Sequence, residues 1–212
     1  MTRAWRRLGQ LLLGLPLFGF ACALIIVAGI GVDPWSVFHQ GLHRSIGLSI
    51  GSLTVITGVV VLLLWIPLRQ RPGLGTVLNI LLIGPFLDLG LWLIPPPAGL
   101  WQRAGCFALG LALLAIASGL YIGARHGAGP RDGLMTGLHS RLGWPIWLSR
   151  TSVEVTVLGV GWLLGGNVGA GTVLFALLIG PLCALTLPCF DVGPQPEPAG
   201  AASATSELER LS

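Results

Sequence analysis

Charged residues are scarce in this chain of 212 residues. Asp, Glu, Lys and Arg together make up 9% of it, whereas 53% of the residues are hydrophobic and the mean hydropathy is +0.83. A soluble domain of this length needs more polar surface than these proportions provide. They exclude such a domain and predict a chain embedded in the lipid bilayer.

Lysine is absent, so the net charge of +4 comes from arginine alone. In so apolar a chain a basic excess indicates membrane orientation rather than nucleic-acid binding, and we expect no nucleic-acid partner. With the N-terminus in the cytoplasm, only Arg44 and Arg103 fall outside, and Arg150 lies just inside the fifth span. The positive-inside rule therefore places both termini in the cytoplasm. The cytoplasmic arginines are then Arg3, Arg6, Arg7, Arg69, Arg71, Arg125, Arg131, Arg141 and Arg210.

Cysteines are few and enzyme motifs are missing. The four cysteines include no closely spaced pair, so neither a disulfide framework nor a thiolate metal site is indicated. His39 and His43 stand at helical spacing, but no carboxylate motif completes a metal site, and loop histidines are the simpler interpretation. The sequence contains no nucleophile elbow, phosphate-binding loop followed by lysine or dinucleotide fingerprint. We expect no enzyme activity, metal or cofactor.

Long apolar runs dominate what is present. Crossing a hydrocarbon core of ~30 Å takes about 20 helical residues, and barrel strands would alternate instead. The first run follows three arginines like a signal peptide, but it continues unbroken through Ile25 to Ala28 and has an internal counterpart, so we retain it as a helix. The six predicted spans cover 8–30, 48–68, 74–94, 104–124, 146–165 and 170–190.

The sequence matches itself without gaps at an offset of 96 residues. From Trp5 paired with Trp101 through Leu91 paired with Leu187, 34 of 87 positions are identical, against about a tenth by chance. Three spans per unit is an odd number, so the second unit must enter the membrane from the opposite side, as in many secondary transporters. We predict an all-α fold of two inverted repeats, 1–96 and 97–190. The polar remainder, 191–212, is predicted to be a disordered cytoplasmic tail.

A polar stretch follows the first span of each unit, at 31–47 and 127–143. Asp33 is placed to cap a short helix that begins at Pro34. Two interpretations stay open for this pair of short helices: they lie in the membrane interface, or they are re-entrant and aim their N-termini into a cavity.

The third span of each unit contains a Gly-Pro pair in its middle, Gly84-Pro85 and Gly180-Pro181. Proline cannot donate a backbone hydrogen bond, so each span is expected to kink and to leave one carbonyl unpaired. Interrupted spans at matching points of two halves indicate a transport site, although packing kinks are also common in membrane helices.

Three ionisable residues lie within the predicted spans: Asp88, Arg150 and Glu154. Charges in lipid are costly, so we expect the three to converge on one inward-facing site near the Gly84-Pro85 kink. Arg150 and Glu154 can pair along one helical face, which also permits a purely structural role. The predicted substrate- or ion-binding set is Asp88, Glu154, Arg150, Asp132, Asp33 and Asn79.

Four segments together resemble the YczE/YyaS/YitT group of bacterial membrane proteins: GVDPWSVFHQGL (31–42), GTVLNILLIGPFLD (75–88), GAGPRDGLM (127–135) and GTVLFALLIGP (171–181). The resemblance spans roughly 8–190 and falls on the YczE-type branch. It implies an integral protein of the bacterial inner membrane, with transport or export suggested for some members.

The leading hypothesis is a small secondary transporter or permease for a small solute or drug-like molecule, with export and proton coupling left open. The alternative is a non-transporting accessory or regulatory membrane protein, and a homo-oligomer or a membrane partner is compatible with either. A transporter should contain a polar cavity between its halves that includes Asp88 and Glu154, whereas an accessory protein can have a packed interior.

Overall fold

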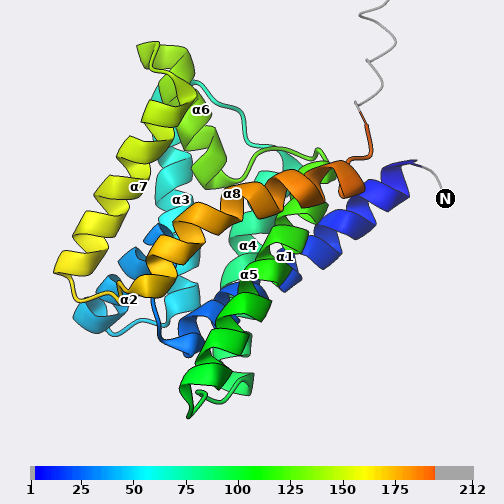
Figure 1. Cartoon of the computed structure of the whole chain (residues 1–212). Coiled ribbons are helices and arrows are strands. Elements are labelled where there is room, and N and C mark those ends of the chain that lie inside the picture. The colour runs from blue at the N-terminus through cyan, green and yellow to red at the C-terminus, as the bar shows by residue number, and fades with distance from the viewer. Residues whose placement is uncertain (1–2, 194–212) are drawn as a thin grey trace, which may run out of the picture.

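The computed structural model describes residues 3–193, and over that range the chain forms eight helices and no strand (Figure 1). The predicted tail therefore lies outside the described residues except for its first three positions. The helices are α1 (Arg3–Ala28), α2 (Pro34–Ile46), α3 (Ile50–Leu68), α4 (Leu74–Leu93), α5 (Leu100–Gly123), α6 (Pro130–Leu142), α7 (Ile146–Leu163) and α8 (Ala170–Phe190).

The sequence repeat recurs in the helices. Helices α2, α3 and α4 begin 96 residues before α6, α7 and α8, and α1 corresponds to α5. The two expected short helices are α2 and α6, of 13 residues each. Both Gly-Pro pairs lie inside continuous helices, α4 and α8.

Five helices are long and apolar enough to cross a bilayer: α1 over Ala4–Ala28, α3, α4, α5 and α8. The expected sixth span coincides with α7, an 18-residue helix that contains Arg150 and Glu154 and is not among these five. The all-helical membrane fold is thus observed, with five clear spans among the described residues.

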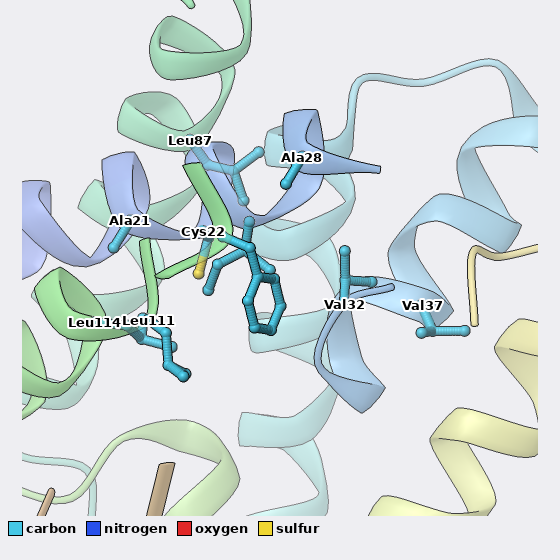
Figure 2. Close-up of a cluster of buried hydrophobic side chains, with 10 residues drawn as sticks. Ala21, Cys22, Ala28, Val32, Val37, Leu87, Leu111 and Leu114 are labelled. Carbon is cyan, nitrogen blue, oxygen red and sulfur yellow. The ribbon is translucent and has the colours of Figure 1, made fainter. Parts of the chain in front are cut away.

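The core forms where α1 packs against α5 and α4. Small residues let these helices approach closely: a methyl group on Gly110 of α5 would lie 3.0 Å from Ala21 O of α1. Figure 2 shows the resulting apolar cluster, in which α1, α4, α5 and the chain around α2 all take part. Its labelled members are Ala21, Cys22, Ala28, Val32, Val37, Leu87, Leu111 and Leu114.

The short helices are exchanged between the halves. Helix α2 packs on α7, where Gly161 closely approaches the backbone of Phe38, and α6 packs on α3. At the second contact Trp65 Nε1 donates to Pro130 O at 3.0 Å, and Gly133 lies against the Trp65 ring. Each half therefore completes the packing of the other.

Reciprocal backbone contacts tie the halves together and explain the repeated GTVL blocks. Gly75 N donates to His126 O and Gly171 N donates to Ile30 O, both at 2.8 Å. In each case the loop after the first helix of one half docks on the N-terminus of the last helix of the other half. The threonine that follows each glycine binds the same loop. Thr76 Oγ1 donates to Ala128 O, and Thr172 Oγ1 accepts from Val32 N.

The last two helices of each half differ in their packing. Helix α4 packs on α3, and a methyl group on Gly84 would overlap Gly51 O and Val55 Cγ2. Its counterpart α8 packs extensively on α5 but not on α7, and a methyl group on Gly180 would meet nothing within 4 Å. Figure 1 shows α7 and α8 diverging from the loop that joins them. The second half is therefore more open than the first.

Candidate functional site

A cavity of about 290 Å³ lies between the two halves, and all eight helices contribute to its walls. Apolar side chains such as Phe18, Ile83 and Phe175 form much of the surface, as is usual in small-molecule sites. The polar and ionisable lining residues are Asp33, Ser36, His39, Thr54, Thr57, Asn79, Ser118, Tyr121, Arg131, Asp132, Arg150 and Glu154.

Both short helices point their N-termini at this cavity. Asp33 and Pro34 of the α2 start line it, as do Gly129 and Pro130 of the α6 start. The C-terminal parts lie elsewhere. Helix α2 meets the α7–α8 loop, where Asn167 N donates to Gln40 Oε1, whereas the end of α6 meets the end of α3, where Gln70 bonds Ser140. This is the arrangement that the re-entrant interpretation expects.

The two N-termini are capped differently. Asp33 accepts a hydrogen bond from Ser36 N at 3.2 Å and so caps α2 as predicted. The corresponding residue of α6 is Gly129, which has no side chain, and α6 has no side-chain cap. Their backbones are nearly identical, with φ −63° and ψ 156° at Asp33 and φ −61° and ψ 158° at Gly129. The first-turn amides of α6 are thus without a side-chain acceptor.

Two ion pairs neutralise most of the cavity charge. Arg131 Nη1 lies 3.7 Å from Asp33 Oδ2, and its guanidinium stacks 4.7 Å from the centre of the Trp35 ring. On α7, Arg150 Nε donates to Glu154 Oε1 at 3.0 Å. The Asp33–Arg131 pair joins the starts of the two short helices across the cavity.

The remaining carboxylate is that of Asp132, in the first turn of α6. Tyr121 OH donates to Asp132 Oδ2 at 2.9 Å, and no basic side chain of the described residues is within ion-pair distance. A methyl group on Gly129 would lie 3.2 Å from this oxygen and 3.6 Å from Asn79 Nδ2. Asp132, Tyr121 and Asn79 therefore surround the uncapped start of α6.

His39 presents a free acceptor. It is only 2% exposed, and its Nε2 has no hydrogen-bond partner in the described chain. Thr54 Oγ1 lies 2.9 Å from Ile50 O and 3.1 Å from His39 Nδ1. With the Thr54 proton donated to Ile50 O, His39 donates from Nδ1, and its Nε2 is the acceptor. Burial, with a smaller contribution from the Arg131 cation, lowers the pKa of His39 to about 3 on this non-spanning helix. The ring is therefore neutral.

The predicted convergence of Asp88 with Arg150 and Glu154 is wrong. Asp88 does not line the cavity. Its carboxylate accepts from Ser49 Oγ at 2.6 Å and from Gly51 N at 2.7 Å, at the start of α3. A carboxylate at a helix N-terminus satisfies backbone donors and the helix dipole, so Asp88 escapes lipid by capping a neighbouring helix.

The other predicted residues divide by location. The cavity is lined by Asp33, Asn79, Asp132, Arg150 and Glu154, whose binding role stays a prediction. Of the residues predicted to kink their helices, Gly180 lines it, whereas Gly84 lies in the α3–α4 contact. Pro85 and Pro181 are exposed and do not line it.

His39, Tyr121 and Arg131 are cavity residues that the sequence prediction of the site omitted. The repeat held a usable signal for two of them. His39 of the first half corresponds to Met135 of the second half, and Trp35 corresponds to Arg131. At both positions one half carries a polar or charged side chain where the other carries an apolar one. Within residues 3–193 no three His, Cys, Asp or Glu side chains gather as a metal site would require.

Comparison with known proteins agrees with the resemblance noted from the motifs. The profile of a family of unknown function, DUF6198, matches residues 5–188. An uncharacterized protein of Haemophilus influenzae is 40% identical over 179 residues, which cover 84% of this chain and 82% of the relative. The uncharacterized membrane protein YczE of Bacillus subtilis is 34% identical over 177 residues, 82% of each chain.

A more distant relative is the uncharacterized protein YyaS of Bacillus subtilis. It is 27% identical over 183 residues, which cover 84% of this chain and 91% of the relative. No solved structure matches this chain. The predicted resemblance to the YczE-type group is confirmed, and with it the membrane location.

Proposed function

We propose that this chain, which belongs to the DUF6198 family of unknown function, is a small secondary transporter or permease that moves a small solute through the cavity between its two halves. One observation carries the proposal: the cavity is lined from both halves, and both short helices start at it. An accessory protein needs no such interior. The cavity contains Glu154, as a transporter should, but not Asp88.

The proposal includes six spans arranged as two inverted repeats. The reciprocal docking of Ile30 on Gly171 and of His126 on Gly75 is the contact pattern expected for halves related by a two-fold axis. Helix α7 is the sixth span. Its Arg150–Glu154 pair lowers a cost of about 2.5–3.5 kcal/mol per lipid-facing charge.

We further propose that the protein resides in the bacterial inner membrane with both termini in the cytoplasm. The two ends of the described chain lie together, since Arg7 Nη2 donates to Gly193 O at 2.8 Å. Arg44 and Arg103, the two arginines that are assigned to the outside, lie at the other end of the bundle. Arg103 lies beside Gly29 at the end of α1, and Arg44 lies beside Gly165. The excess of arginine on the first side satisfies the positive-inside rule.

A ligand screen tests the function. The purified full chain in nanodiscs is heated with a panel of small solutes at several pH values, and unfolding is followed by tryptophan fluorescence. A transported solute should raise Tm, because binding to the folded state stabilises it. Asp132→Asn and Glu154→Gln should reduce the rise. Asp191→Asn, an equivalent change outside the cavity, should preserve it.

Each solute that binds is then offered to proteoliposomes, with and without a pH gradient. Accumulation or exchange that depends on the protein supports transport, and dependence on the pH gradient supports proton coupling. If no solute binds and none crosses, the transporter proposal fails. That result would favour the alternative, a non-transporting accessory or regulatory membrane protein.

A further inference from the structure

The uncapped start of α6 indicates which chemical group the cavity can bind. In the first half the Asp33 carboxylate occupies the cap position and accepts from Ser36 N. In the second half the same backbone conformation carries Gly129. The helix N-terminus, with its partial positive charge, is left open to the cavity. A ligand carboxylate placed here would repeat what Asp33 does for α2.

A simple carboxylate fits this position poorly. Asp132 Oδ2 would lie only 3.2 Å from a methyl group on Gly129. Two carboxylates so close repel each other, and no basic side chain of the described residues is within ion-pair distance of Asp132. A ligand that carries an ammonium group next to its carboxylate removes the repulsion by pairing with Asp132.

The free acceptor of His39 leads to the same conclusion. Its Nε2 is buried, unprotonated and without a partner, and His39 lines the same cavity. Such an atom needs a hydrogen-bond donor. An ammonium N–H supplies one, whereas a carboxylate does not.

We propose that the cavity binds a small zwitterion of the α-amino-acid type, with its carboxylate capping α6 at Gly129 and its ammonium group facing Asp132 and His39. The apolar walls formed by Phe18, Ile83 and Phe175 accommodate an apolar side chain. The cavity of about 290 Å³ limits the ligand to a small molecule. This assignment rests on the proposed transport function and specifies its substrate class.

Matched ligands test the assignment on the full chain in nanodiscs by calorimetric titration. Alanine, leucine and phenylalanine are each compared with the decarboxylated amine and with the deaminated acid. At least one amino acid should bind about tenfold or more tightly than both of its analogues, because charge-assisted hydrogen bonds to each end are worth that much. Equal binding by an amine or by an acid would overturn the zwitterion assignment.

Gly129→Asn provides an internal substitute for the ligand carboxylate that adds no charge beside Asp132. The backbone at Gly129 already matches that of Asp33, so the amide oxygen of the new side chain should cap α6, raise the Tm of the ligand-free protein and abolish amino-acid binding. Asp191→Asn should leave binding unchanged. Undiminished binding by a Gly129→Asn protein with raised Tm would refute the position of the carboxylate.

Failure of this assignment is distinguishable from failure of the transport function. If no amino acid binds but another solute of the screen is bound and transported, the substrate class is wrong and transport stands. If no solute binds and none is transported, both the substrate class and the transport function are refuted.

Discussion

At the scale of residues, an ionisable group in a membrane helix need not belong to a transport site. Asp88 is the clearest example, because both of its oxygens accept hydrogen bonds from the start of α3. The cost of a charge in lipid predicted that Asp88 would turn inward and meet Glu154, but the three-dimensional packing of α4 on α3 directs it to a helix terminus. Such a contact cannot be seen from one helix alone.

Replacing this carboxylate tests its role. Asp88→Ala should lower the free energy of unfolding by about 1–2 kcal/mol, the usual cost of losing a capping group. It should leave ligand affinity unchanged, since Asp88 lies outside the cavity. Denaturant unfolding and titration on the same preparation separate the two effects, and a lost affinity with intact stability would restore Asp88 to the site.

Asp191 shows a pH-dependent contact at the end of α8. Arg125 donates from Nε and Nη2 to its two carboxylate oxygens at 2.8 and 2.7 Å. Chiefly through these hydrogen bonds, the pKa of Asp191 falls from 3.8 to about 2. A depressed pKa means that the contact stabilises the folded chain above pH ~4, and that this contribution is lost as the pH falls toward 2.

A spin label at Val192 should report this loss. Its mobility should be low at neutral pH and rise between about pH 4 and 2. Asp191→Asn should make the label mobile throughout that range. An unchanged spectrum in the variant would mean that the neighbouring bonds of Arg7 and Gln10 hold this segment without the ion pair.

At the scale of elements, the sequence predicted the helices better than their partners. Apolar length gave the long helices, and Asp33-Pro34 gave the start of α2, because these signals are local. The exchange of α2 and α6 between the halves was not predicted, since it depends on contacts such as Trp65 with Gly133. The repeat showed which residues correspond but not which surfaces meet.

The two mid-helix glycines provide a matched pair of substitutions. Gly84→Ala should destabilise the protein by about 1–3 kcal/mol, because a methyl group overlaps Gly51 O and Val55. Gly180→Ala should change stability by no more than about 0.5 kcal/mol, since nothing lies within 4 Å. Both variants are measured by denaturant unfolding in the same detergent, and equal losses would contradict the observed difference in packing.

At the scale of the whole molecule, the arginine distribution leads to a test of orientation. Cysteines are introduced singly at Pro97, Asn167 and Ala128 after the native cysteines are removed. A membrane-impermeant thiol reagent added to cells should label the first two, which lie in the α4–α5 and α7–α8 loops. Position 128 should react only after the cells are opened. Labelling of 128 from outside would reverse the proposed topology.

The asymmetry between the halves predicts where the molecule moves. The contact between α3 and α4 is secured by Asp88 and by the close approach of Gly51 to Gly84. At the corresponding positions the second half has Ala184, Trp147 and Gly180, so neither the carboxylate bond nor the small-residue contact can form. Helix α8 is held mainly by α5. We expect α3 and α4 to remain together while α8 changes its distance from α7 during the transport cycle.

Pairs of spin labels can measure this directly. One pair is placed on exposed faces of α3 and α4, at Val59 and Val77, and its counterpart on α7 and α8, at Val155 and Val173. The first pair should give one narrow distance distribution with or without a bound ligand. The second should be broad in the free protein and shift when a ligand occupies the cavity, since a ligand that bridges α6 and the facing walls favours the conformation that encloses it. A narrow, unresponsive distribution for α7 and α8 would indicate a fixed gap, which suits an accessory protein that receives a partner helix there better than it suits a transporter.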